Sequence, residues 1–76
     1  MQRRKVRHAD GEKFGSIVRQ LREERGLTQE ELGNLAGISA TYVGFVERGD
    51  SVPTLTIILQ IAAALGVRAA ELLRDF

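Results

Sequence analysis

Apolar side chains recur three and four positions apart along the chain, which is the spacing of helices that bury one face. The first such segment runs from residue 11 or 12 to residue 25, and Gly26 follows where a left-handed residue ends a helix. Its inward residues are Phe14, Ile17, Val18 and Leu21. The pattern therefore predicts a first amphipathic helix that supplies part of a core.

A second, shorter helix is predicted to begin after Thr28. The Thr28 hydroxyl can accept a hydrogen bond from a backbone N–H of the first turn, while Glu31 reaches back to the N–H of Thr28. This reciprocal arrangement is a capping box. Leu32, Leu35 and Ala36 then share one face, and Gly37 stands where the helix would end.

A third helix is predicted directly after this glycine turn, with Ser39 as its N-cap. Val43 and Val46 form its inward stripe, which leaves Ala40, Thr41, Gly44 and Phe45 toward the other side. Two short helices joined by a tight turn at about residues 28–48 are typical of a helix-turn-helix. Such an outward face fits the major groove of double-stranded DNA, which is the partner we expect.

The remaining chain predicts two more helices. Residues 49–53 are rich in turn formers, Thr54 can cap a fourth helix that runs to Leu65, and Gly66 ends it. Residues 68–76 are predicted to form a short fifth helix. The expected fold is all-α, a compact bundle of five helices without strands, repeats or linkers.

The fourth predicted helix is apolar on nearly every side, since only Thr56 and Gln60 are polar between residues 55 and 65. A helix with one solvated face should show a broader polar stripe. A homodimer would cover this surface together with the apolar end of the chain, and the predicted interface residues are Ile57, Leu72, Leu73 and Phe76. The alternative is that a single protomer buries most of them.

Composition agrees with one small domain. The chain has 76 residues, 43% of them hydrophobic. Domains of this size gain much stability from a disulfide, a structural metal ion or a partner subunit. Cysteine is absent and the one histidine, His8, stands in a basic stretch, so neither a disulfide nor a metal or cofactor site is expected. No apolar run reaches the length of a membrane span, and the first eight residues lack the apolar segment of a secretory signal.

Basic charge is concentrated at the N-terminus. Residues 1–26 hold eight Lys or Arg against four Asp or Glu, whereas residues 27–76 hold three against six. We therefore divide the chain into a flexible basic arm at residues 1–10 and a folded domain at residues 11–76. The arm carries Arg3, Arg4, Lys5 and Arg7. It is either a solubilising tail or a segment that touches phosphates or the minor groove.

Several motifs resemble the phage-repressor helix-turn-helix family, also called Cro-like or XRE. They are the segments at 26–32 (GLTQEEL), 37–39 (GIS), 47–49 (ERG), 53–55 (PTL) and 61–67 (IAAALGV), together with Tyr42. The resemblance covers roughly residues 14–76. It implies a lambda-repressor-like five-helix DNA-binding domain, similar to small Cro-like repressors and to restriction-modification controller proteins.

The resemblance also implies roles for individual residues. Gln29, Tyr42, Arg48, Ser51 and Thr54 would contact DNA phosphates, which position a protein without reading sequence. Ala40, Thr41 and Phe45 would face the bases. Because none of these three is Gln, Asn or Arg, we expect thymine-methyl packing, DNA shape and arm contacts to carry much of the specificity.

The same resemblance places Arg22 of the first helix against Glu47 of the third as a structural ion pair. The alternative is two surface charges. Three residues depart from the family pattern: Gly33 stands where alanine is usual, Gly44 where serine is common, and Arg68 where a capping residue is frequent. Gly33 would permit close helix packing and Gly44 a close approach to DNA, but the sequence does not decide either role.

The expected function is a sequence-specific transcriptional regulator that binds a pseudo-palindromic operator as a homodimer in the cytoplasm. No small-molecule effector is expected, because the sequence ends with the fifth predicted helix. An antitoxin-like protein, or a helical interaction module with weak or no DNA binding, is the alternative. An enzyme is not expected, because the chain lacks cysteine, a second histidine and a Gly-rich phosphate loop.

Overall fold

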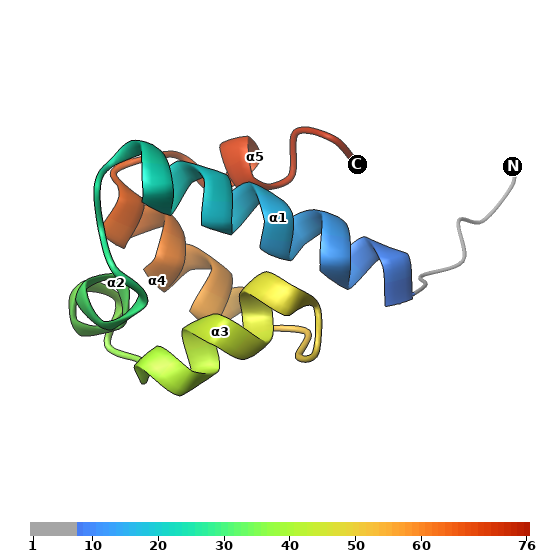
Figure 1. The fold of residues 1–76 in the computed structure, drawn as a ribbon. Helices are drawn as coiled ribbons and strands as arrows, with labels where there is room; N and C mark the ends of the chain where they lie inside the picture. The colour runs from blue at the N-terminus through green and yellow to red at the C-terminus, as the bar shows by residue number, and fades with distance from the viewer. Residues whose placement is uncertain (1–7) are drawn as a thin grey trace, which may run out of the picture.

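The computed structural model describes residues 8–76, and residues 1–7, which contain the four basic residues of the predicted arm, lie outside the described residues. The described chain folds into five α-helices and no strands, which confirms the predicted all-α class (Figure 1). In chain order they are α1 (His8–Glu24), α2 (Gln29–Ala36), α3 (Ala40–Arg48), α4 (Leu55–Leu65) and α5 (Ala69–Leu72).

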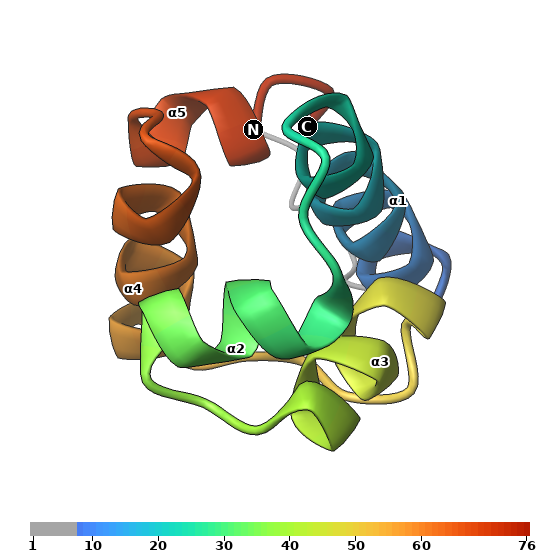
Figure 2. The same ribbon diagram turned by 60° about the vertical axis from the view of Figure 1, so that its left-hand side comes forward.

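The helices enclose a single core. Helix α1 packs against α3, α2 packs against both α3 and α4, and α5 closes the remaining side against α4 and α1, as Figure 2 shows. The core side chains are Phe14, Ile17, Val18, Leu21, Leu32, Ala36, Val43, Val46, Ile61, Ala62, Leu65 and Leu72. Every inward residue predicted for the first and third helices is among them.

The predicted starts and stops of the central helices are confirmed. Thr28, Ser39 and Thr54 are the N-caps of α2, α3 and α4, and each hydroxyl accepts a hydrogen bond from a backbone N–H three residues on. Gly37 ends α2 with a φ of 75°, and its N–H donates to the carbonyl oxygen of Gly33. The left-handed turn at Gly37 sets α3 across α2, which is the geometry of a helix-turn-helix.

Three predictions need correction. Helix α1 begins at His8, so the last part of the predicted arm is helical. Helix α5 ends at Leu72 and is a single turn rather than a helix through residue 76, and its N-cap Arg68 makes no side-chain capping bond. Leu35 is 61% exposed rather than inward, because the buried face of α2 is formed by Leu32, Gly33 and Ala36.

Gly33 allows close packing at the turn between α2 and α3, and Arg25 connects the C-terminal ends of α1 and α4. A Cβ atom on Gly33 would lie 2.6 Å from the carbonyl oxygen of Ile38, so the glycine permits the close turn between α2 and α3. Arg25 Nε donates to the carbonyl oxygen of Leu65 at 2.6 Å, and its Nη1 donates to that of Leu21 at 3.0 Å. Arg25 therefore joins the C-terminal ends of α1 and α4, two groups of otherwise orphaned carbonyls.

The capping box of α2 is complete. Thr28 Oγ1 accepts from the N–H of Glu31 at 3.0 Å, and Glu31 Oε1 accepts from the N–H of Thr28 at 2.9 Å. The backbone and side-chain hydrogen bonds from Thr28 hold the pKa of Glu31 below its ordinary value of 4.5. The carboxylate also lies in the first turn of α2, where the positive end of the helix dipole favours negative charge.

We expect Glu31→Gln to show, through the pH dependence of stability, how much the negative charge of Glu31 contributes to this cap. Because the folded pKa is lowered, the charge contributes stability above pH 4.5, and that contribution is lost as the pH falls through the folded pKa. Glutamine can still close a capping box but does not titrate. Thermal melts should therefore show the variant less stable than the wild type at neutral pH and equal to it in strong acid. A difference that stays constant over this range would show that the charge contributes nothing.

Candidate nucleic-acid interface

The outward face of α3 is formed by Thr41, Phe45 and Arg48, which are exposed at successive helical turns. The opposite side buries Val43, Val46 and Glu47, and Gly44, which was predicted to lie toward the outward side, is buried as well. The Ser39 hydroxyl accepts from the N–H of Tyr42 at 3.0 Å and so fixes the start of the helix. Ala40, the remaining predicted base-reading residue, is half-buried at this N-terminal end.

Phe45 and Arg48 form one unit on this face. The Phe45 side chain is 42% exposed and has no place in the core. The Arg48 guanidinium lies over its ring, 5.4 Å from the centroid, which is within the range of cation–π contacts. Arg48 Nε also donates to Asp50 Oδ2 at 3.1 Å. Two neighbours therefore hold the Arg48 guanidinium beside α3.

Beneath this face, Arg22 and Glu47 form a buried ion pair. Arg22 Nε and Nη2 donate to the two carboxylate oxygens of Glu47 at 2.7 and 3.1 Å, and Nη1 donates to the carbonyl oxygen of Leu27 at 2.8 Å. The side chains of Arg22 and Glu47 are 11% and 3% exposed. The hydrogen bonds to Glu47 raise the pKa of Arg22 above its ordinary value, against the opposing effect of burial. The pair joins α1 to α3.

Glu47 has a third hydrogen-bond donor, Gln29. Gln29 is the first residue of α2, and its Nε2 donates to Glu47 Oε1 at 3.1 Å. The side-chain amide of Gln29 is therefore fixed at the N-terminus of α2, where backbone N–H groups and the helix dipole favour an anion. Among the described residues, no buried side-chain nitrogen or oxygen lacks a hydrogen-bond partner.

The remaining predicted phosphate contacts lie around the loop between α3 and α4. Ser51 Oγ lies 3.4 Å from the Tyr42 hydroxyl and forms a hydrogen bond with it, and Tyr42 is half-buried against the core. Thr54 Oγ1 accepts from the N–H of Ile57 at 3.3 Å as the N-cap of α4. Tyr42 and Thr54 therefore have structural contacts in addition to any contact with DNA.

The predicted dimer residues differ in burial, and only Leu73 and Phe76 among them are exposed. Leu72 is fully buried in the protomer core and cannot meet a partner, because the single turn of α5 directs it inward, and Ile57 is half-buried. Leu73 and Phe76 are 42% and 48% exposed. The large apolar side chains of α4 that are exposed are instead Leu55, at 69%, and Leu59, at 50%.

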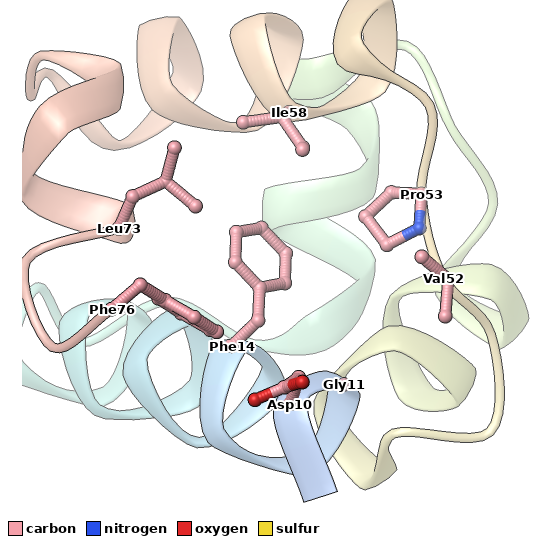
Figure 3. A pocket seen from close by; sticks show the side chains of 8 residues that line it. All are labelled: Asp10, Gly11, Phe14, Val52, Pro53, Ile58, Leu73 and Phe76. Atoms are coloured by element: carbon pink, nitrogen blue, oxygen red, sulfur yellow. The ribbon is translucent and has the colours of Figure 1, made fainter. Parts of the chain in front are cut away.

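An apolar pocket of about 140 Å³ lies between the start of α1, the loop before α4 and the C-terminal residues. Figure 3 shows Phe14 at its centre, with Ile58 and Pro53 on one side and Leu73 and Phe76 on the other. Lys13 holds the end of the chain against α1: its Nζ donates to the carbonyl oxygen of Asp75 at 3.0 Å and lies 5.1 Å from the centroid of the Phe76 ring. The pocket therefore extends the exposed apolar surface at the C-terminal residues.

Residues 8–76 contain no group of three or more His, Cys, Asp or Glu side chains that could hold a metal ion. No helix within the same range is both long and apolar enough to cross a membrane.

Two features of the interface go beyond what the sequence predicts. The first is the ion pair of Arg48 with Asp50, although the spacing of two residues could have suggested it. The second is the position of Gly44 beside the side chains of Arg48 in α3 and Gln29 in α2. No sequence signal predicts that these two side chains lie near each other.

Comparison with known proteins gives three kinds of match. A family model described as helix-turn-helix matches residues 18–72. The chain is 45% identical over 58 residues to the uncharacterized HTH-type transcriptional regulator y4dJ of Sinorhizobium fredii, covering 76% of this chain and 75% of y4dJ. It is 41% identical over 63 residues to the cryptic phage CTXphi transcriptional repressor RstR of Vibrio cholerae, covering 82% of this chain and 56% of RstR.

Among solved structures, the restriction-modification controller protein C.AhdI from Aeromonas hydrophila matches with a TM-score of 0.83 and 47% identity. The match covers 84% of this chain and 97% of C.AhdI. The likeness in sequence and in structure therefore extends over most of both chains.

Proposed function

The chain belongs to the phage-repressor (Cro-like, XRE) helix-turn-helix family of DNA-binding transcriptional regulators, and on this premise we propose that it is a sequence-specific regulator that binds a pseudo-palindromic operator as a homodimer. The observation that carries the proposal is the division of α3 into two faces. One face is tied to the core through Glu47, and the other presents Thr41, Phe45 and Arg48. In a cell, such a protein would act in the cytoplasm on double-stranded DNA.

Phosphate contacts would come from both ends of the helix-turn-helix. Gln29 lies at the N-terminus of α2 with its amide already oriented by Glu47, and Arg48 lies at the C-terminal end of α3. Tyr42, Ser51 and Thr54 offer hydroxyl groups along the same edge. Contacts on both sides of α3 would fix its register in the major groove.

Base contacts would come from Ala40, Thr41 and Phe45. Thr41 can donate to or accept from a base edge, whereas Ala40 and the Phe45 ring can pack on thymine methyls. With few hydrogen-bonding groups on this face, DNA shape would add to specificity. The basic residues Arg3, Arg4, Lys5 and Arg7, which lie outside the described residues, would add phosphate or minor-groove contacts.

The homodimer would use the exposed apolar surface of α4 and the C-terminal residues. Leu55 and Leu59 are one helical turn apart on α4, and Leu73 and Phe76 border the pocket of Figure 3. Burying this surface would offset the small core of the protomer. A two-fold dimer would place two α3 helices roughly 34–36 Å apart, one turn of DNA.

Selection of binding sites from a random-sequence duplex library tests the proposal. We expect the selected duplexes to share two inverted half-sites separated by about one helical turn. Phe45→Ala should weaken binding to the selected duplex by about 1–3 kcal/mol and relax the preference at one base pair of each half-site, with little change in the melting temperature.

Thr41→Ser is a matched control, because it keeps a hydroxyl on the same face and should keep the selected sequence. Selected duplexes without two-fold symmetry would contradict the homodimer. Failure to retain any duplex at low salt would contradict the function and favour a protein-interaction module. A Phe45→Ala protein that melts far below the wild type but keeps its sequence preference would assign Phe45 to packing.

A further inference from the structure

A glycine in the middle of α3 needs a reason, because glycine is less favourable in a helix than alanine. Gly44 has no left-handed backbone that would require glycine, and α3 continues through it without a break. The position is nevertheless buried, although it lies next to Phe45 of the exposed face. Neighbouring side chains therefore cover it.

Those side chains are Arg48 and Gln29. A Cβ atom on Gly44 would lie 3.0 Å from Arg48 Nη1, and 3.6 and 3.7 Å from Gln29 Oε1 and Nε2. The first distance is shorter than ordinary van der Waals contact, so the Arg48 guanidinium would have to shift by a few tenths of an ångström. The missing Cβ thus lets the guanidinium of Arg48 and the amide of Gln29 approach each other over the surface of α3.

The other contacts of the two side chains are already fixed. Gln29 Nε2 is held by Glu47, and Arg48 is held by the Phe45 ring and by Asp50. Arg48 uses Nε for Asp50, so its Nη1 is the nitrogen turned toward Gly44 and Gln29. The free protein therefore holds both groups close together between the N-terminus of α2 and the C-terminal end of α3.

We propose that Gly44 is a positioning residue for DNA binding: it leaves the space in which Arg48 and Gln29 converge, so that the two side chains grip the same stretch of DNA phosphates. The inference rests on the proposed DNA-binding function and adds to it a role for a residue that touches no DNA. It differs from a direct approach of the DNA backbone to Gly44, because here the space is filled by the protein's own side chains.

The test compares Gly44→Ala and Gly44→Met with the wild type. Alanine and methionine both favour helices over glycine, so the melting temperature should rise by about 4–8 °C for alanine and should not fall below wild type for methionine. Binding to the duplex selected by the wild type should nevertheless weaken, severalfold for alanine and about tenfold or more for methionine, which fills the space. The slope of the log–log salt dependence should shrink by about 0.9 for each phosphate that the variant no longer neutralises.

Gly11→Ala is the matched control. Gly11 is also a helical glycine, but a Cβ there would make an ordinary contact of 3.5 Å with the carbonyl oxygen of Gly49. We expect this variant to gain thermal stability and to bind the duplex like the wild type. If Gly11→Ala weakened DNA binding as much as Gly44→Ala does, the inference would be overturned.

The decisive measurement repeats Gly44→Ala in an Arg48→Ala background, because the alanine Cβ would make only ordinary contacts of 3.6 and 3.7 Å with Gln29. If Gly44 acts through Arg48, the alanine should not weaken binding further there. A loss from Gly44→Ala that persists without Arg48 would overturn the proposal in favour of a direct approach of DNA to the helix. Binding of the duplex by Gly44→Met with wild-type affinity would overturn the positioning role alone, whereas absence of binding by the wild type would overturn the proposed function and this inference together.

Discussion

Replacing Glu47 with alanine is expected to lower the free energy of unfolding by about 3–5 kcal/mol. The carboxylate is 3% exposed and accepts three hydrogen bonds, two from Arg22 and one from Gln29. Without it, the guanidinium of Arg22 keeps only the carbonyl oxygen of Leu27 as a partner while it stays largely buried. Urea unfolding followed by circular dichroism measures the loss.

Two further variants distinguish the cost of leaving the Arg22 charge buried without a partner from the net contribution of the ion pair to stability. Glu47→Gln keeps the shape and one acceptor oxygen, so it should lose less stability than the alanine variant and remain measurable if alanine prevents folding. The double variant Arg22→Met with Glu47→Leu removes both charges and should be more stable than Glu47→Ala. A Glu47→Ala protein within about 1 kcal/mol of the wild type would show that the pair behaves like a surface pair.

Loss of Glu47 should also affect the proposed DNA-binding surface, because the same carboxylate orients Gln29. In a population that stays folded, Glu47→Gln would still offer an oxygen to the amide of Gln29, whereas alanine would release it. The comparison of these two variants in DNA binding therefore reports on orientation and not on folding. The ion pair thus links the core, through Arg22, to the proposed phosphate contact at α2.

The helix order was predictable because its signals are local. Thr28 and Glu31 close a capping box within one turn, and Gly37 ends α2 through its own backbone angle, so neither depends on distant residues. Helix α5 was predicted too long because Leu73 and Phe76 are apolar and looked like part of a helical face, whereas Lys13 holds Asp75 and Phe76 against α1 without a helix. A contact across 62 residues leaves no local pattern.

The candidate site was predictable only in part for the same reason. Thr41 and Phe45 follow from helical spacing, since Val43 and Val46 account for the inward face. Leu35 has the spacing of an inward residue but is exposed. The face of α2 that is buried contains Gly33 instead, which packs closely against the turn that leads into α3. The roles of Gly15 and Gly44 depend on distances between helices, which the sequence does not encode locally.

Gly15 carries the second large expected effect. It lies in the middle of α1 and is buried against the C-terminal end of α3. A Cβ atom there would overlap the carbonyl oxygen of Val46 and would lie 2.6 Å from that of Glu47. Both are backbone atoms of a helix and cannot rotate away, so α1 and α3 would have to separate.

We expect Gly15→Ala to lower the free energy of unfolding by about 3 kcal/mol, at the upper end of the range for overpacked cores. This sign opposes helix propensity, which alone would favour alanine by about 1 kcal/mol. Gly11→Ala lies one turn earlier in α1, makes an ordinary 3.5 Å contact, and should instead be stabilising. Urea unfolding of both variants measures the difference between them, in which the gain in helix propensity from glycine to alanine cancels. A Gly15→Ala protein as stable as Gly11→Ala would show that α1 and α3 can move apart freely, and the close helix contact would then contribute little to the fold.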